Sequence, residues 1–133
     1  RKIAAMRQFH EAGIRTTCFI SPIFPGITDV KSIILKCKDH CNLIWLENLN
    51  LRGAYKTAIL RYIDAHAPHL SALYAEIYQQ GKRQYWEKLN EELSSFCQDL
   101  GLDYVRNDDS IERGIDGPPI VVNYFYHEEI RKR

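Results

Sequence analysis

The stretch IRTTCFI at residues 14–20 decides the fold. It is rich in β-branched and aromatic residues, a composition typical of a buried strand. An amphipathic helix pattern precedes it at residues 1–12, and Gly13 occupies the position where helices commonly end. We predict a loop at 21–26, because its two prolines and one glycine interrupt regular structure.

A second unit of the same kind follows. Its predicted elements are a helix at 28–41 that Thr28 caps, with Asp29 in its first turn, a strand LIWL at 43–46, an exit loop at 47–53 and a helix at 54–65. Nearly continuous apolar strands that are joined by helices are typical of a parallel sheet covered by helices. The sequence therefore predicts an α/β fold.

The remainder of the chain changes character. The predicted elements are helices at 70–80 and 83–100, a short strand at 102–105, a polar mobile loop at 106–119, a strand at 120–126 and a charged tail at 127–133. We divide the chain into βα units at 1–66 and a helical extension at 67–133, which carries the polar loop, the final strand and the tail. Two clear βα units are too few to close a barrel, so we expect either an open partial sheet or a sheet edge that pairs with another copy.

Length and charge limit the function classes. The 133 residues suffice for one domain, and 18 basic against 17 acidic residues give little support for nucleic-acid binding. No apolar run is long enough to span a bilayer, and we expect no membrane partner. Four scattered cysteines favour reduced thiols in a cytoplasmic protein. Because the helix pattern starts at once, without Met or an N-cap, we expect a fragment of a longer chain.

The strand exits are the expected binding region, because ligands of parallel α/β folds lie at the carboxyl ends of the strands. After the second predicted strand come Glu47, Asn48, Asn50 and Arg52. Glutamate and asparagine side chains can hydrogen-bond a sugar or an amino acid, and arginine can bind a carboxylate. The alternative is a capped turn with solvated polar groups.

Two segments carry a family resemblance. Residues 13–17 (GIRTT) and 21–29 (SPIFPGITD) resemble the fifth strand and following loop of radical SAM enzymes, in particular the group similar to spore photoproduct lyase and DNA-repair-photolyase-like proteins. LIWLENLNL at 43–51 looks like the sixth strand and its exit. The resemblance covers residues 1–60 best, and of the family pattern G-x-I-x-G-x-x-E this chain keeps the middle glycine as Gly26.

The resemblance implies a partial barrel that binds S-adenosylmethionine and a 4Fe-4S cluster and forms a 5′-deoxyadenosyl radical. It also implies adenine contacts at the strand exits, at the positions of Ile23, Phe24, Gly26, Leu46, Glu47 and Asn48. We assign Asn50 and Arg52 to the substrate, and the catalytic residue is unknown. The implied parent protein is an enzyme, whereas we expect this fragment to be inactive alone and to bind neither cofactor alone.

The family binds its cluster through C-x-x-x-C-x-x-C. Cys37 and Cys41 have the first spacing, but Ile44 stands where the third cysteine belongs. We therefore expect the cluster ligands in a missing N-terminal half, which would be the main partner of this chain. Cys37 is predicted to be packed and Cys41 to lie near a helix end, with a zinc site that includes His40 as the alternative. His66, His69 and His127 are weaker candidates.

Two rival functions remain open. The first is a non-catalytic binding or interaction module, in which the aromatic run Tyr74, Tyr78, Tyr85 and Trp86 stacks on nucleic-acid bases. At helical spacing such a run is more often part of a core. The second is a hydrolase or aldolase on an ordinary barrel, with Glu47 as the general base. A homodimer formed through the exposed sheet edge is a further expected partnership.

Overall fold

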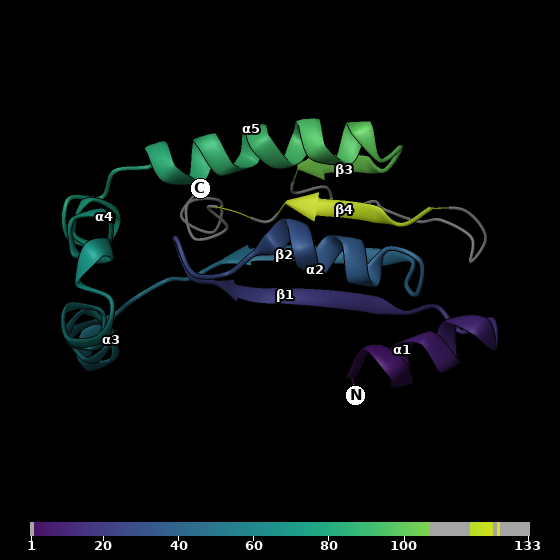
Figure 1. Cartoon of the computed structure of the whole chain (residues 1–133), viewed down its shortest axis with the longest axis horizontal. Helices are drawn as coiled ribbons and strands as arrows, with labels where there is room; N and C mark the ends of the chain where they lie inside the picture. Colours follow the sequence, from purple (N-terminus) through teal and green to yellow (C-terminus); the bar gives the residue numbers. More distant parts are fainter. Residues whose placement is uncertain (1, 107–117, 124, 126–133) are drawn as a thin grey trace.

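The computed structural model describes residues 2–106, 118–123 and 125, and its centre is a four-stranded parallel sheet with the strand order β1-β2-β4-β3 (Figure 1). The strands are β1 (Thr17–Ile23), β2 (Leu43–Asn48), β3 (Asp103–Arg106) and β4 (Ile120–Asn123). The predicted α/β class is confirmed. His127, the tail and most of the predicted polar loop lie outside the described residues.

Helices lie between and beside these strands. They are α1 (Lys2–Glu11), α2 (Val30–Cys37), α3 (Gly53–His66), the 3-10 turn η1 (Pro68–Leu70), α4 (Ser71–Tyr74), the π-helical turn η2 (Ala75–Gln79) and α5 (Gln84–Asp99). The single α-helix predicted at 70–80 is thus a short α-helix that continues as a π-helix. Apolar spacing did not distinguish the two, because π turns are rare and each of these elements is only about one turn long. No described helix combines the length and the apolar content that crossing a bilayer requires.

The sheet contains strands from both predicted parts of the chain, residues 1–66 and residues 67–133. β4 lies between β2 and β3, and it is parallel to both. The last described strand is therefore central to the sheet, whereas β1 forms one edge. The four described strands do not close on themselves, and this open sheet is the architecture that the structure shows.

β1 begins and ends three residues later than predicted, and residues 14–16 precede the strand. The segment 21–23, expected to be loop, continues the strand as far as Ile23. The interpretation that Pro22 must end the strand was wrong because β1 is an edge strand whose pairing register shifts between Ile20 and Ile23. Proline lacks a backbone N–H, and edges and irregular positions of a sheet tolerate that loss.

β2 also extends beyond its predicted end. Glu47 and Asn48, expected in the exit loop, are its last two residues, and Asn48 pairs with Ile23 of β1. Helix α2 differs from expectation at both ends, and it ends at Cys37, four residues before the predicted end. Its N-cap is Asp29, whose carboxylate accepts a hydrogen bond from the backbone N–H of Ser32 at 3.2 Å. Thr28 instead accepts a hydrogen bond from the backbone of Phe24 at 2.9 Å.

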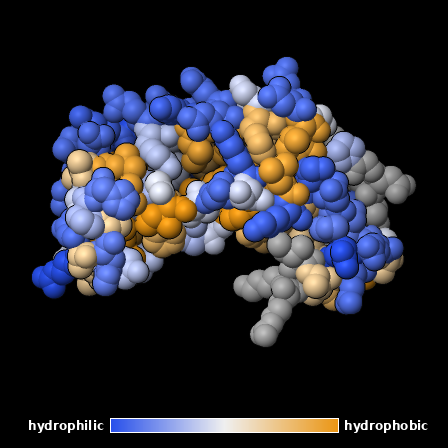
Figure 2. All heavy atoms as spheres, in the orientation of Figure 1, coloured by the Kyte–Doolittle hydropathy of each residue, from blue (hydrophilic) through white to orange (hydrophobic). Residues whose placement is uncertain are grey.

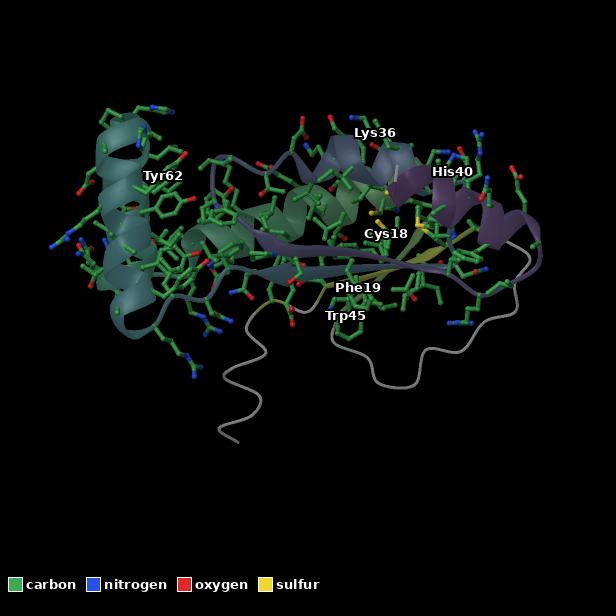
Figure 3. All side chains as sticks on the ribbon, turned by 90° about the horizontal axis from the view of Figure 1, so that it is seen from below. Cys18, Phe19, Lys36, His40, Trp45 and Tyr62 are labelled. Carbon is green, nitrogen blue, oxygen red and sulfur yellow. The ribbon has the colours of Figure 1, made fainter. Side chains whose placement is uncertain are left out.

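The two faces of the sheet have different environments. Ile20, Ile44 and Val121 lie on one face, where they form the main core with residues of α2 and α5. Phe19 and Trp45 lie on the opposite face, away from these helices (Figure 3). Phe19 is 68% exposed, and its ring centroid is 6.3 Å from that of Trp45. Parallel sheets usually have both faces covered, so this face at the β1 edge is unusually open.

Candidate functional site at the strand exits

The exits of β1 and β2 lie side by side. Ile23 and Asn48 are partners in the sheet register, and the backbone N–H of Leu49 donates to the carbonyl of Ile23 at 3.1 Å. Two loops that are separated in sequence by helix α2 therefore leave the sheet at the same edge. The expected grouping of polar residues at one end of the sheet depends on this pairing.

Two of the predicted adenine contacts have apolar side chains that are fully buried. Ile23 and Leu46 are both 0% exposed and belong to the main core. Leu46 also pairs on one side with Ile20 and on the other with Asn123. Its backbone is therefore inside the sheet, where ladder hydrogen bonds occupy N–H and C=O groups.

Residues of the later helices pack against part of the loop after β1. Gly26 has a φ of +71°, and a Cβ atom added there would lie 2.8 Å from a methyl carbon of Leu70. The backbone N–H of Gly26 donates to the hydroxyl of Tyr85 at 2.8 Å. Phe24 packs against the small cluster of Leu49, Ile63 and Tyr74. The glycine thus permits the close approach of Leu70, at a position where the resemblance implies adenine contact.

Three tyrosines, which we call the tyrosine clamp (Tyr74, Tyr78 and Tyr85), hold both exit loops. Tyr74 donates to the carbonyl of Pro25 at 2.8 Å, and Tyr78 donates to the carbonyl of Leu49 at 2.8 Å. Burial raises the pKa of Tyr74 to about 12, and it raises the pKa of Tyr78 further. Both hydroxyls therefore remain protonated donors at neutral pH.

The tyrosine clamp also bears on the base-stacking hypothesis. Tyr74 is 0% exposed, and Trp86 is 3% exposed within the main core. Side chains with so little exposed area cannot offer a ring face to a nucleic-acid base. The structural role that helical spacing favoured is confirmed for these two residues. The sequence did not predict which carbonyl groups accept the hydrogen bonds of the tyrosine hydroxyls. The one indication of such bonds was the presence of tyrosines, with their polar hydroxyls, in an apolar stripe.

Asn48 is the most unusual residue at the strand exits. Its side chain is 7% exposed, and its Oδ1 atom is buried without a hydrogen-bond partner among the described residues. Its Nδ2 atom donates to Oδ1 of Asn50 at 3.4 Å, a long hydrogen bond. Leaving a buried acceptor unsatisfied costs about 1–3 kcal/mol. Native proteins seldom retain such an atom, and a ligand is one of the few explanations.

Glu47 lies on the opposite face of the sheet from Asn48. Ser21 Oγ donates to Glu47 Oε2 at 2.9 Å, so the ends of β1 and β2 also meet on this face. Alternation along the strands puts this pair beyond Phe19 and Trp45. Asn50 is exposed in the exit loop, and Arg52 is exposed at the start of α3. The predicted polar residues therefore divide between two faces and a loop.

The predicted cysteines lie in the protein interior. Cys37 and Cys41 are each 1% exposed, which confirms the packed environment expected for Cys37. The Sγ atom of Cys41 donates to the carbonyl of Cys37 at 3.2 Å. Within the described part of the chain, no three side chains of histidine, cysteine, aspartate or glutamate are arranged to hold a metal ion. His66 stacks on Tyr62, with ring centroids 4.5 Å apart.

Comparisons with known proteins give one informative relative. No protein-family model matches the chain, and no solved structure gives a significant match. An uncharacterized protein of Methanocaldococcus jannaschii is 34% identical over 83 residues, which cover 48% of this chain and 32% of that protein. The chain is therefore similar to part of an archaeal protein, and it spans about a third of the length of this curated relative.

Proposed function

We propose that this chain is the C-terminal part of a radical SAM enzyme and that the exits of β1 and β2 form one wall of its S-adenosylmethionine cleft. The unsatisfied Oδ1 of Asn48 carries the proposal. It lies at the sequence position where the resemblance implies adenine contact. A buried acceptor at the carboxyl end of a parallel strand is suited to a ligand that brings its own hydrogen-bond donor.

The residues fit part of the cofactor. Asn48 would accept a hydrogen bond from the exocyclic amino group of adenine, which satisfies its buried oxygen. Glu47 lies on the opposite face of β2 and is therefore not assigned to the same nucleoside, whereas Asn50 with Arg52 would bind the substrate. S-adenosylmethionine, together with a 4Fe-4S cluster, supplies radical chemistry that abstracts a substrate hydrogen. The cluster ligands would come from another part of the full-length protein, which we expect in the cytoplasm.

The exposed β1 edge supports the proposal that a further part of the protein completes a partial barrel. Exposed apolar side chains gather along β1 and α1, with Phe9 54% and Ile14 51% exposed in addition to Phe19. Figure 2 shows a hollow in the outline of the molecule below the β1 edge, between α3 and α1. A further strand of the same chain, parallel to β1, would extend the sheet into a partial barrel. The greater length of the archaeal relative is consistent with such a segment, and a second copy is the alternative occupant.

Replacing Asn48 by leucine tests the adenine contact. In the full-length protein, we expect Asn48→Leu to weaken the binding of S-adenosylmethionine about tenfold, because one hydrogen bond is lost. The free energy of unfolding without ligand should stay the same or rise by about 1 kcal/mol, because an unsatisfied buried acceptor is removed. Equilibrium binding and urea titration measure the two effects.

Gln98→Ala, which removes an exposed amide from α5, is the matched control and should leave both quantities unchanged. If Asn48→Leu binds S-adenosylmethionine with wild-type affinity, the proposed contact between Asn48 and adenine is wrong. A full-length protein that binds no iron and sulfide on anaerobic reconstitution, and that forms no 5′-deoxyadenosine, would contradict the radical SAM assignment itself.

The hydrogen bond between Ser21 and Glu47 favours a second candidate, a hydrolase or aldolase in which Glu47 is the general base. In that case Glu47→Gln should lower turnover by the full-length protein about a hundredfold or more, because proton abstraction is lost. A pH–rate profile that loses its acidic limb in the variant would identify the carboxylate as the base. Unchanged turnover would exclude this mechanism.

A further inference from the structure

Cys18 and Cys37 are in direct contact. Cys18 lies on the helix-covered face of β1, and Cys37 is the last residue of α2. Their Sγ atoms are 3.1 Å apart, and both are free thiols. A disulfide bond has a length of about 2.05 Å, so the two sulfur atoms need to approach by only about 1 Å. Cys37 belongs to the main core and Cys18 packs against that core, so both side chains are held close to each other.

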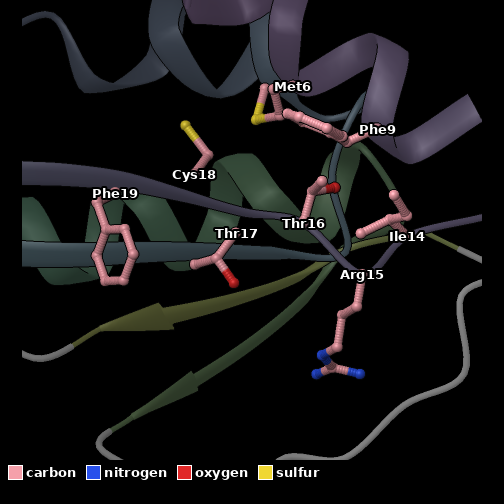
Figure 4. Close-up of a pocket in the computed structure, with 8 residues that line it drawn as sticks. All are labelled: Met6, Phe9, Ile14, Arg15, Thr16, Thr17, Cys18 and Phe19. Carbon is pink, nitrogen blue, oxygen red and sulfur yellow. The ribbon is translucent and has the colours of Figure 1, made fainter.

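The two thiols differ in access. Cys18 is half-buried and lines a cavity of about 630 Å³ between α1 and the start of β1. Figure 4 shows Cys18 directed toward the side where Met6 lies, whereas Phe19 points the opposite way. Cys37, Cys41 and Cys97 are all buried. A small oxidant that enters the cavity therefore meets Cys18 first, and Cys37 is the nearest thiol that can react next.

We propose that Cys18 and Cys37 form a reversible disulfide when the protein meets a hydroperoxide. The thiolate of Cys18 attacks the terminal peroxide oxygen, the O–O bond breaks, and water or an alcohol leaves after protonation. The thiol of Cys37 then attacks the sulfenic sulfur, the S–S bond forms, and the hydroxyl group leaves as water with the Cys37 proton. The two thiols lose two electrons, which reduce the peroxide.

The proposed bond encloses the first candidate loop. The segment between Cys18 and Cys37 contains the β1 exit and helix α2, including Ile23, Phe24 and Gly26. Oxidation would tie the end of α2 to the edge strand, and it would restrict this loop in the unfolded chain. The inference rests on the two sulfur positions and the cavity, so it is independent of the proposed radical SAM activity.

Cys41 is the thiol that could compete with Cys18 for Cys37. It follows Cys37 by four residues, and its Sγ atom donates to the backbone carbonyl of Cys37. Burial raises the pKa of Cys41 to about 12, and burial together with the contact with Cys37 raises the pKa of Cys18 as well. Both thiols are therefore protonated at neutral pH, and oxidation should be slow there because the thiolate is the nucleophile. The test is best run in mildly alkaline solution over hours.

Peptide mass spectrometry after hydrogen peroxide treatment of the reduced full-length protein, with free thiols alkylated, tests the proposal. We expect a linked pair of peptides that carry Cys18 and Cys37, and a melting temperature that is higher by about 10 °C. Dithiothreitol should reverse both changes. Cys18→Ser should abolish the link, and Cys97→Ala, the matched control in α5, should retain it.

A second measurement avoids any substitution. Phenylarsine oxide binds two thiols only where they are close, with release of water. Peptide mapping of the reduced wild-type protein should place one equivalent on Cys18 and Cys37, where it should block the peroxide-induced link. A Cys37–Cys41 link, or Cys18 recovered as sulfinic acid without a link, would overturn the proposal. Failure of phenylarsine oxide to bind would overturn it as well.

Discussion

The free energy of unfolding is expected to fall by on the order of 3 kcal/mol between about pH 8 and pH 10. Burial raises the pKa of Cys41 to about 12 and that of Cys97 to about 11, both above the usual value of a cysteine thiol. Cys18 shifts in the same direction, because burial and the contact with Cys37 both disfavour its thiolate. The three thiols therefore act together in alkaline solution.

The sign follows from proton binding. Above pH 9 these thiols ionise in the unfolded chain and remain protonated in the folded chain. The unfolded state then binds fewer protons, so stability decreases as pH rises. The contribution is complete below about pH 9 and is lost progressively toward the folded-state pKa values. Tyr74 and Tyr78 add to the loss above about pH 10, because their pKa values are raised as well.

Urea titration at a series of pH values, with a reductant present, measures this effect. Cys97→Ala should make the pH dependence shallower by about one proton, because it removes one of the three groups. The reductant prevents the Cys18–Cys37 link from adding stability of its own. A free energy of unfolding that does not change between about pH 8 and pH 10 would contradict the burial of these thiols.

Tyr78→Phe is expected to lower the free energy of unfolding by about 2 kcal/mol. The substitution removes the hydroxyl that donates to the carbonyl of Leu49, and it leaves that carbonyl, on a residue that is 3% exposed, without this donor. Tyr74→Phe should have an effect of similar size through Pro25. Because the rings of Tyr74 and Tyr78 are in contact, with centroids 5.6 Å apart, the double variant need not be additive.

Chemical denaturation compares these variants with Tyr55→Phe, which removes a hydroxyl from a side chain that is 54% exposed and should change stability by less than about 0.5 kcal/mol. The tyrosine clamp predicts a second effect. Backbone amides of the two exit loops should exchange faster with solvent in Tyr78→Phe, because a bond that closes the loops is lost. Equal stability of Tyr78→Phe and Tyr55→Phe would exclude an energetic role for the clamp.

The candidate site was predictable only in part. Polar residues after the second strand can be read directly along the chain, and strand exits are the usual binding edge of a parallel sheet. Which of them is buried cannot be read in this way. Asn48 and Glu47 are adjacent in sequence, yet they lie on opposite faces of β2. The strand extends two residues beyond its predicted end, and successive side chains of a strand point to opposite faces.

The amino-acid sequence by itself determined the α/β class, the position of the first two strands and most helix boundaries. These features depend on local signals, namely apolar runs, helical spacing and glycine or proline at element ends. The confirmed parallel pairing of β1 and β2 also follows from local sequence signals, because a helix between two apolar strands favours parallel pairing.

Only the tertiary structure decided the strand order, the continuation of β1 through Pro22, the unsatisfied oxygen of Asn48 and the contact between Cys18 and Cys37. Each depends on groups that are distant in sequence. β4 enters the sheet beside β2 although more than 70 residues separate them, and the tyrosine clamp reaches loops some 30 to 60 residues away. Periodicity reports which face of an element is apolar, whereas packing selects the partner that this face meets.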